Sequence, residues 1–190
     1  LVYTNADAPN YKVVSIDPKN PAKENWITII PERTKFLQQV STAGGKLLLT
    51  YLEDASSKVY QCTYKGKPDR EIQLPGIGTA SGFGGDKEDK EFFYTFTSYN
   101  YPPTIFRYDI ASGKSKLFRK TEVKVKPEEY STLQTFFTSK DGTKVPMFIT
   151  YKKGMKLDGN NPLLLYGYGG FNIAQTPGFS ISNAFFLEQG

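Results

Sequence analysis

Histidine is absent from this sequence of 190 residues, and cysteine occurs once, at Cys62. Without histidine the chain cannot by itself complete a Ser-His-Asp or Cys-His nucleophile system, because the group that shuttles the proton is missing. Zinc sites that use histidine are excluded within the chain, and a single cysteine forms neither a thiolate cage nor a disulfide framework. We therefore predict no cofactor and no metal, and we expect other residues to complete whatever chemistry the chain serves.

Long hydrophobic runs are lacking as well. No apolar stretch approaches the roughly 20 residues needed to cross a bilayer, and the first residues lack the basic and apolar regions of a secretion signal. The excess of positive charge is small, with 24 basic and 19 acidic residues. The densest basic stretch, 114–126, alternates charged and apolar residues, which favours a solvated edge strand over a nucleic-acid site. We therefore predict no membrane and no nucleic acid as partners.

Aromatic residues are abundant at 15%, and they favour β-strands. Three alternating segments, each followed by residues typical of a turn, recur at 11–16, 58–64 and 104–110. An apolar, strand-like segment precedes each of them. A period of about 45 residues that holds four short strands is typical of the blades of a β-propeller.

Blade packing gives this repeat a physical reason. One small sheet cannot bury both of its faces, whereas stacked blades cover one another. Two complete blades follow from strands expected over residues 36–43, 46–54, 56–64, 70–76, 79–85, 91–99, 104–110 and 114–120. Residues 1–31 add the later strands of a preceding blade, so that 1–126 is predicted to be a partial β-propeller of about two and three-quarter blades. The alternative is a pair of antiparallel meanders with accidental spacing. Because such a propeller cannot close, we expect the sequence to be cut from a longer chain.

The composition changes near Pro127. Two apolar-rich strands, 130–139 and 144–151, flank an Asp-Gly dipeptide that is typical of a tight hairpin turn. Pro146 places the second strand at a sheet edge or a bulge. A continuous apolar run, Leu163–Tyr166, then predicts a buried strand, and the glycine-rich stretch that follows it suits the mouth of an α/β sheet.

Tyr168 lies within that glycine-rich stretch. Glycines allow a sharp turn and a close approach of the backbone to a ligand. In α/β-hydrolases the loop in this position supplies one donor of the oxyanion hole, and a tyrosine hydroxyl can serve as such a donor. The residues alone leave an alternative open, in which Tyr166 and Tyr168 are half-buried aromatics at a strand end. Phe171 alone would be interpreted as a packing residue.

The second segment, 127–190, resembles the start of the catalytic domain of the prolyl oligopeptidase family of serine peptidases. The resemblance rests on the combination of Ser139–Phe148, 152–154 and Leu165–Asn172, the last of which reads Leu-Tyr-Gly-Tyr-Gly-Gly-Phe-Asn. The Tyr-Gly-Tyr-Gly core also occurs in the related oligopeptidase B group, whereas the Gly-Phe-Asn that follows favours the prolyl branch. Residues 1–126 resemble, more weakly, the last part of that family's seven-bladed propeller.

The resemblance implies a mainly β chain in which a partial propeller precedes the first strands of an α/β-hydrolase domain. It implies a cytoplasmic, or sometimes periplasmic, serine peptidase that cleaves short peptides after proline. Tyr168 is then the oxyanion donor and Phe171 an aromatic wall of the proline pocket. The resemblance places the serine, aspartate and histidine beyond Gly190, so we expect the chain alone to be inactive. Because its blade edges are open and the sheet of its second segment is unfinished, we also expect it to self-associate through those edges. Two alternatives remain: a non-enzymatic propeller that binds a protein partner, and a related peptidase with basic specificity.

Overall fold

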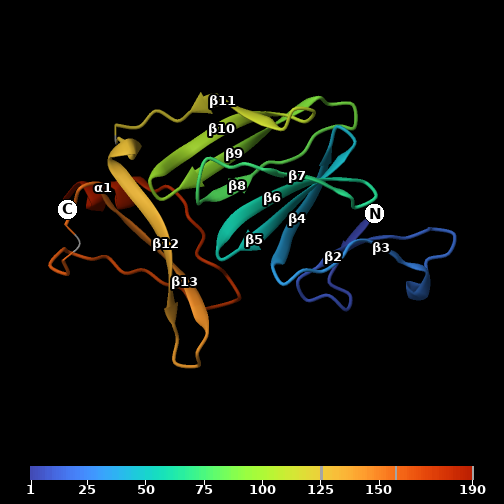
Figure 1. Ribbon diagram of the computed structural model, residues 1–190, viewed down its shortest axis with the longest axis horizontal. Helices are drawn as coiled ribbons and strands as arrows, with labels where there is room; N and C mark the ends of the chain where they lie inside the picture. Colours follow the sequence, from blue (N-terminus) through green and yellow to red (C-terminus); the bar gives the residue numbers. More distant parts are fainter. Residues whose placement is uncertain (125, 157, 190) are drawn as a thin grey trace.

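The structure, a computed structural model, describes residues 1–124, 126–156 and 158–189. Three antiparallel sheets follow one another along the chain, and a two-stranded ribbon and a short helix lie beside them at one end (Figure 1). The first sheet has three strands, in the order β1 (Val2–Thr4), β2 (Lys12–Ser15) and β3 (Ile27–Ile30). Short 3-10 turns occupy Lys23–Asn25 and Pro127–Glu129.

The second and third sheets have four strands each, and strands that are consecutive in sequence are neighbours in the sheet. The second sheet contains β4 (Phe36–Ala43), β5 (Lys46–Glu53), β6 (Ser56–Thr63) and β7 (Pro68–Ile72). The third contains β8 (Thr79–Ser81), β9 (Glu91–Ser98), β10 (Tyr101–Asp109) and β11 (Lys114–Lys120). This arrangement agrees with the predicted succession of one incomplete and two complete blades.

Strand β5 shows why the sheets stack. Its consecutive residues Leu47, Leu48 and Leu49 are all buried, although successive side chains of a strand point to opposite faces. Leu47 and Leu49 pack in one cluster with Val13 of the first sheet, whereas Leu48 packs in another with Phe92 of the third. The second sheet is therefore covered on both faces, as a blade between two neighbours must be.

The third sheet buries only one face against the second. Tyr94 and Phe96 of β9 belong to the buried cluster between the two sheets. Phe93 lies on the other face, 42% exposed, and its ring centroid is 4.7 Å from that of Phe118 on β11. Strand β11 is the edge of the sheet, and its basic side chains are exposed, which confirms the edge strand predicted within 114–126.

The residues after 126 form a separate ribbon of two strands, β12 (Tyr130–Thr138) and β13 (Lys144–Lys152). The predicted turn joins them: Gly142 has a φ of +86°, and its N–H donates to the carbonyl of Ser139 at 3.0 Å. Pro146 lies opposite Phe136. Both strands of a two-stranded ribbon are edges, so the missing N–H of proline is tolerated, as the sequence predicted.

Helix α1 (Ile181–Gln189) was not predicted from the sequence. It begins after Ser180, whose carbonyl accepts the N–H of Ala184 at 3.0 Å. Ala184 is buried, and the helix lies against β13. A serine that precedes a stretch free of glycine and proline is a helix start signal, and it could have revealed the helix.

Within residues 1–124, 126–156 and 158–189, no helix has the length and apolar character needed to cross a bilayer.

Candidate functional site

The predicted buried strand at Leu163–Tyr166 is wrong. These residues adopt no regular secondary structure, and Leu163 and Leu165 are 82% and 77% exposed. A buried strand needs a hydrogen-bonded neighbour and a layer over each face. In the described part of the chain no strand pairs with this run, so its leucines remain in contact with solvent.

Tyr168 follows this run after one intervening residue, Gly167, and is 48% exposed. Its ring folds back over its own loop: a β-carbon placed on Gly170 would lie 3.2 Å from the Tyr168 hydroxyl oxygen. Glycine at position 170 therefore leaves the room that the phenol occupies. Tyr168 as a residue is exposed and is not locked in the interior, which is the accessibility that a donor to a substrate requires.

Phe171 lies in the tight turn that follows. Phe171 and Asn172 both have positive φ, +53° and +55°, and the N–H of Ile173 donates to the carbonyl of Gly170 at 3.1 Å. Two central residues with positive φ define a type I′ turn. Asparagine tolerates this region, but a bulky side chain rarely adopts it, and such strain costs about 1–3 kcal/mol where it occurs. The turn presents the Phe171 ring to solvent, 92% exposed.

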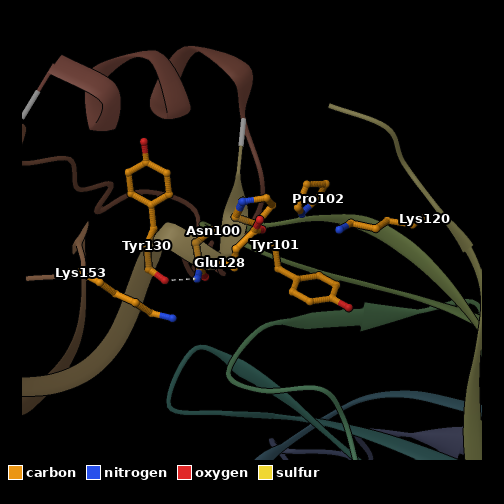
Figure 2. A pocket seen from close by; sticks show the side chains of 8 residues that line it. Asn100, Tyr101, Pro102, Lys120, Glu128, Tyr130 and Lys153 are labelled. Atoms are coloured by element: carbon orange, nitrogen blue, oxygen red, sulfur yellow. Dashed lines mark hydrogen bonds between the residues drawn. The ribbon is translucent and has the colours of Figure 1, made fainter. Parts of the chain in front are cut away.

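Two cavities lie at the junction between the third sheet and the ribbon. The larger has a volume of about 250 Å³. Figure 2 shows Lys120 and Lys153 approaching it from opposite sides, with Glu128 and Asn100 between them. A second cavity of about 200 Å³ shares Asn100 and Tyr101 with the first. Tyr168 and Phe171 line neither of them, so the two predicted site residues lie outside both cavities.

Asn100 joins the two parts of the molecule at this junction. Its side-chain N–H donates to the carbonyl of Tyr130 at 3.1 Å, as Figure 2 shows. Its side-chain oxygen accepts the hydroxyl of Thr132 at 2.9 Å. Further along β12, the amide of Gln134 donates to the carbonyl of Asp54, in the turn between β5 and β6, at 2.5 Å. These bonds hold the ribbon against the ends of both four-stranded sheets.

The most strongly shifted titratable groups lie away from Tyr168. Hydrogen bonds from Lys46 and Gln61 lower the pKa of Asp69 to about 2. A hydrogen bond from the hydroxyl of Ser139, at the turn of the ribbon, lowers the pKa of Asp141 to about 2. These groups stabilise turns and sheet contacts, and the Tyr168 loop is a candidate site on its geometry alone.

No cation site emerges from the described residues, since nowhere in 1–124, 126–156 and 158–189 do three His, Cys, Asp or Glu side chains gather. The thiol of Cys62 is buried, and burial raises its pKa. This setting is the opposite of the exposed, low-pKa environment of a reactive cysteine.

Three polar residues of the third sheet contact the second segment and were not predicted from the sequence, namely Thr79, Thr97 and Asn100. A threonine within a strand conforms to ordinary β propensity and carries no distinguishing pattern. Their partners lie 30 to 98 residues away in the chain. Only the folded arrangement reveals them.

Comparison with known proteins places these observations in a family. The family described as "Prolyl oligopeptidase, N-terminal beta-propeller domain" matches residues 1–121. The chain is 48% identical over 189 residues to the prolyl endopeptidase of Elizabethkingia meningoseptica, covering 100% of this chain and 27% of that protein. It is 49% identical over 190 residues to the prolyl endopeptidase of Elizabethkingia miricola, with the same coverage. The chain thus spans about a quarter of the length of these relatives.

Solved structures of the same family also resemble this chain. One, described as a structural and mechanistic analysis of two prolyl endopeptidases, superposes with a TM-score of 0.90 at 45% identity and covers 99% of this chain and 28% of that one. Prolyl oligopeptidase B from Galerina marginata, bound to a 35-residue hydrolysis and macrocyclization substrate, gives a TM-score of 0.85 at 32% identity, covering 98% and 27%. Both matches extend over the sheets and over the segment that carries Tyr168.

Proposed function

The chain belongs to the prolyl oligopeptidase family, and from that premise we propose that it serves a serine peptidase that cleaves peptides on the carboxyl side of proline. The observation that carries the proposal is the identity of almost one half to two prolyl endopeptidases over essentially the whole chain. That alignment includes the loop of Tyr168 and Phe171, beyond the 121 residues that the propeller family matches.

In the proposed organisation, residues 1–126 are blades of the propeller and residues 127–190 begin an α/β-hydrolase domain. The exposed run Leu163–Tyr166 supports this division. Its leucines are among the most exposed large apolar side chains of the molecule, and an apolar strand of this kind is stable when parallel neighbours pair with it and helices cover both faces. The rest of the hydrolase sheet supplies that cover.

In the proposed mechanism Tyr168 acts in one step, the attack on the substrate carbonyl. A serine hydroxyl passes its proton to the general base as its oxygen bonds to the scissile carbonyl carbon, the carbonyl π bond opens, and its electron pair moves onto the carbonyl oxygen. The Tyr168 hydroxyl donates a hydrogen bond to this oxyanion, which stabilises the transition state more than the neutral substrate. In this proposal, residues outside these 190 supply the serine nucleophile, the histidine base and the aspartate that orients the histidine. The 190 residues contain no histidine. Phe171 offers a ring face to the flat, apolar proline side chain.

Two peptides that differ only in the residue before the scissile bond test the proposed specificity. The full-length protein is assayed with a fluorogenic peptide carrying proline there and with its arginine counterpart. We expect cleavage of the proline peptide with a kcat/KM at least a hundredfold higher. Preferential cleavage of the arginine peptide would support the basic-specific alternative. Cleavage of neither, by a folded protein, would leave the propeller as a binding module and overturn the proposal.

A further inference from the structure

Two threonines of the third sheet hold the stretch that follows the candidate loop. The hydroxyl of Thr79 donates to the carbonyl of Pro177 at 2.7 Å, and the hydroxyl of Thr97 accepts the N–H of Phe179 at 3.2 Å. Thr79 and Thr97 are directly opposite each other on β8 and β9. Opposite residues on an antiparallel pair present their side chains on one face. The two hydroxyls therefore form a single clamp on residues 177–179.

The exposure of the chain decreases at the same residues, 177–179. Residues 162–169 and 171–174 are exposed, whereas Pro177 is buried and its neighbours are half-buried. Proline has no N–H, so its carbonyl is its one backbone group that needs a partner. Thr79 provides that partner. Proline also has a fixed φ, which reduces the conformational entropy lost when this stretch docks.

The clamp itself is fixed on the propeller side. The Thr97 hydroxyl donates to the carbonyl of Tyr101 at 3.0 Å, which leaves its lone pair directed at Phe179. Strand β8 is tied to the second sheet through Ser57, whose hydroxyl accepts the N–H of Ala80 at 3.0 Å and whose N–H donates to the carbonyl of Gly78 at 2.9 Å. Residues 177–179 are thus held in a fixed position relative to both four-stranded sheets.

We propose that Thr79 and Thr97 are positioning residues that fix the Tyr168 loop against the propeller. Upstream, the N–H of Lys153 donates to the carbonyl of Glu129. From there to Pro177, the backbone hydrogen bonds of residues 154–156 and 158–176 close only local turns. The clamp is therefore the first fixed point after the loop. What the loop does at that position rests on the proposed function, whereas its placement by the threonines does not.

Valine variants of the full-length protein test the clamp, because valine keeps the shape of threonine and removes the hydroxyl. Thr79→Val, Thr97→Val and the double variant are compared with Thr79→Ser and Thr97→Ser, which keep the hydroxyl. Thr95→Val is the matched control, since Thr95 is half-buried on the same strand and face as Thr97. Amide hydrogen exchange over residues 166–179 is measured together with kcat and KM on the proline peptide.

We expect exchange at Phe179 and in the loop to accelerate in both valine variants and to return toward the parent rate in the serine variants. We expect kcat to fall by roughly tenfold to a hundredfold with little change in KM, as misplacement of a transition-state donor would produce. The effect should be non-additive with Tyr168→Phe if the clamp acts through that residue. The Thr95→Val control should leave exchange and kcat unchanged.

The outcomes separate this inference from the proposed function. Unchanged exchange in the valine variants overturns the clamp. Accelerated exchange with unchanged kcat, in a protein whose kcat falls in Tyr168→Phe, also overturns it, because the loop then keeps its working position without the threonines. If Tyr168→Phe itself leaves kcat unchanged, the oxyanion assignment fails. The exchange data then decide the clamp alone, and faster exchange at residues 166–171 supports it.

Discussion

The phenol of Tyr108, on β10, donates a hydrogen bond of 3.1 Å to the side-chain oxygen of Gln61, on β6 of the neighbouring sheet. Both side chains are buried within the stacked faces. The amide N–H of Gln61 continues the network to Asp69 at 2.7 Å and to the carbonyl of Ile110 at 3.3 Å. This polar network lies beside the apolar cluster between the second and third sheets, so it links these two sheets and fixes how one packs on the other.

Removing one member of this link should destabilise the protein. In Tyr108→Phe the buried oxygen of Gln61 loses its donor, and an unsatisfied buried polar group costs about 1–3 kcal/mol. We expect the free energy of unfolding of the full-length protein, measured by denaturant titration, to fall by that amount. Tyr64→Phe is the control, since Tyr64 is 38% exposed. Equal stability of the two variants would contradict the structural role of the bond.

Leu48 tests whether the sheets stack as described. It is 0% exposed and lies between the second and third sheets. Leu48→Ala removes buried methyl groups and leaves a cavity, which costs about 2–5 kcal/mol. Thermal and chemical denaturation should both show the loss. Ile27→Ala serves as the control because Ile27 is 65% exposed. A loss no larger than that of the control would mean that the sheets do not pack as blades.

The strands of the two complete blades could be predicted from the sequence because the alternation and turn residues that indicate them are close together in the chain. Alternating apolar residues define β9, and Gly44-Gly45, with φ values of +54° and +71°, closes the hairpin between β4 and β5. The left-handed conformation of Ala55, with a φ of +62°, was not predictable in the same way. It is imposed by the hairpin and not by the residue.

The candidate site was less predictable because its surroundings are not local. The run Leu163–Tyr166 has the composition of a buried strand, but burial depends on neighbouring strands that the run does not encode. The clamp at Thr79 and Thr97 depends on contacts with residues 82 and 98 positions away. The sequence pattern therefore indicated the loop that carries Tyr168 but not the threonines that we propose to hold it.

Acid should weaken the inter-sheet network through Asp69. Hydrogen bonds from Lys46, at 2.8 Å, and from Gln61 lower its pKa from 3.8 to about 2. Because the folded-state pKa is the lower one, the stabilisation is fully present above about pH 4 and is lost as the pH falls toward 2. We expect Asp69→Asn to be less stable at neutral pH and to lose less stability than the parent over that interval. Glu88→Gln, which changes an exposed carboxyl, is the control.

Denaturation curves of the full-length proteins at several pH values between 2 and 5 measure this dependence. Parallel losses in the parent and in Asp69→Asn would show that the Asp69 carboxylate does not couple to folding.

The 190-residue chain by itself should cleave no peptide. It carries no histidine, and the residues proposed to complete the serine machinery lie outside it. The isolated chain is incubated with the proline peptide at concentrations at which the full-length protein gives a measurable rate. Circular dichroism establishes that the chain is folded during the assay, and gel filtration reports whether it self-associates. Turnover by a folded, pure chain would contradict the proposal that the catalytic residues lie outside these 190 residues.

Tyr168→Phe in the full-length protein tests the central assignment, because it removes one hydroxyl and keeps the ring. If that hydroxyl donates to the oxyanion, its loss should lower kcat by about 10²–10³, as for other donors of this kind. KM should change little, since the bond strengthens only as charge develops on the substrate oxygen. Tyr166→Phe is the matched control, since Tyr166 is 75% exposed two residues away. A kcat that falls equally in both variants would indicate a disturbed loop, and an unchanged kcat in Tyr168→Phe would remove the oxyanion role.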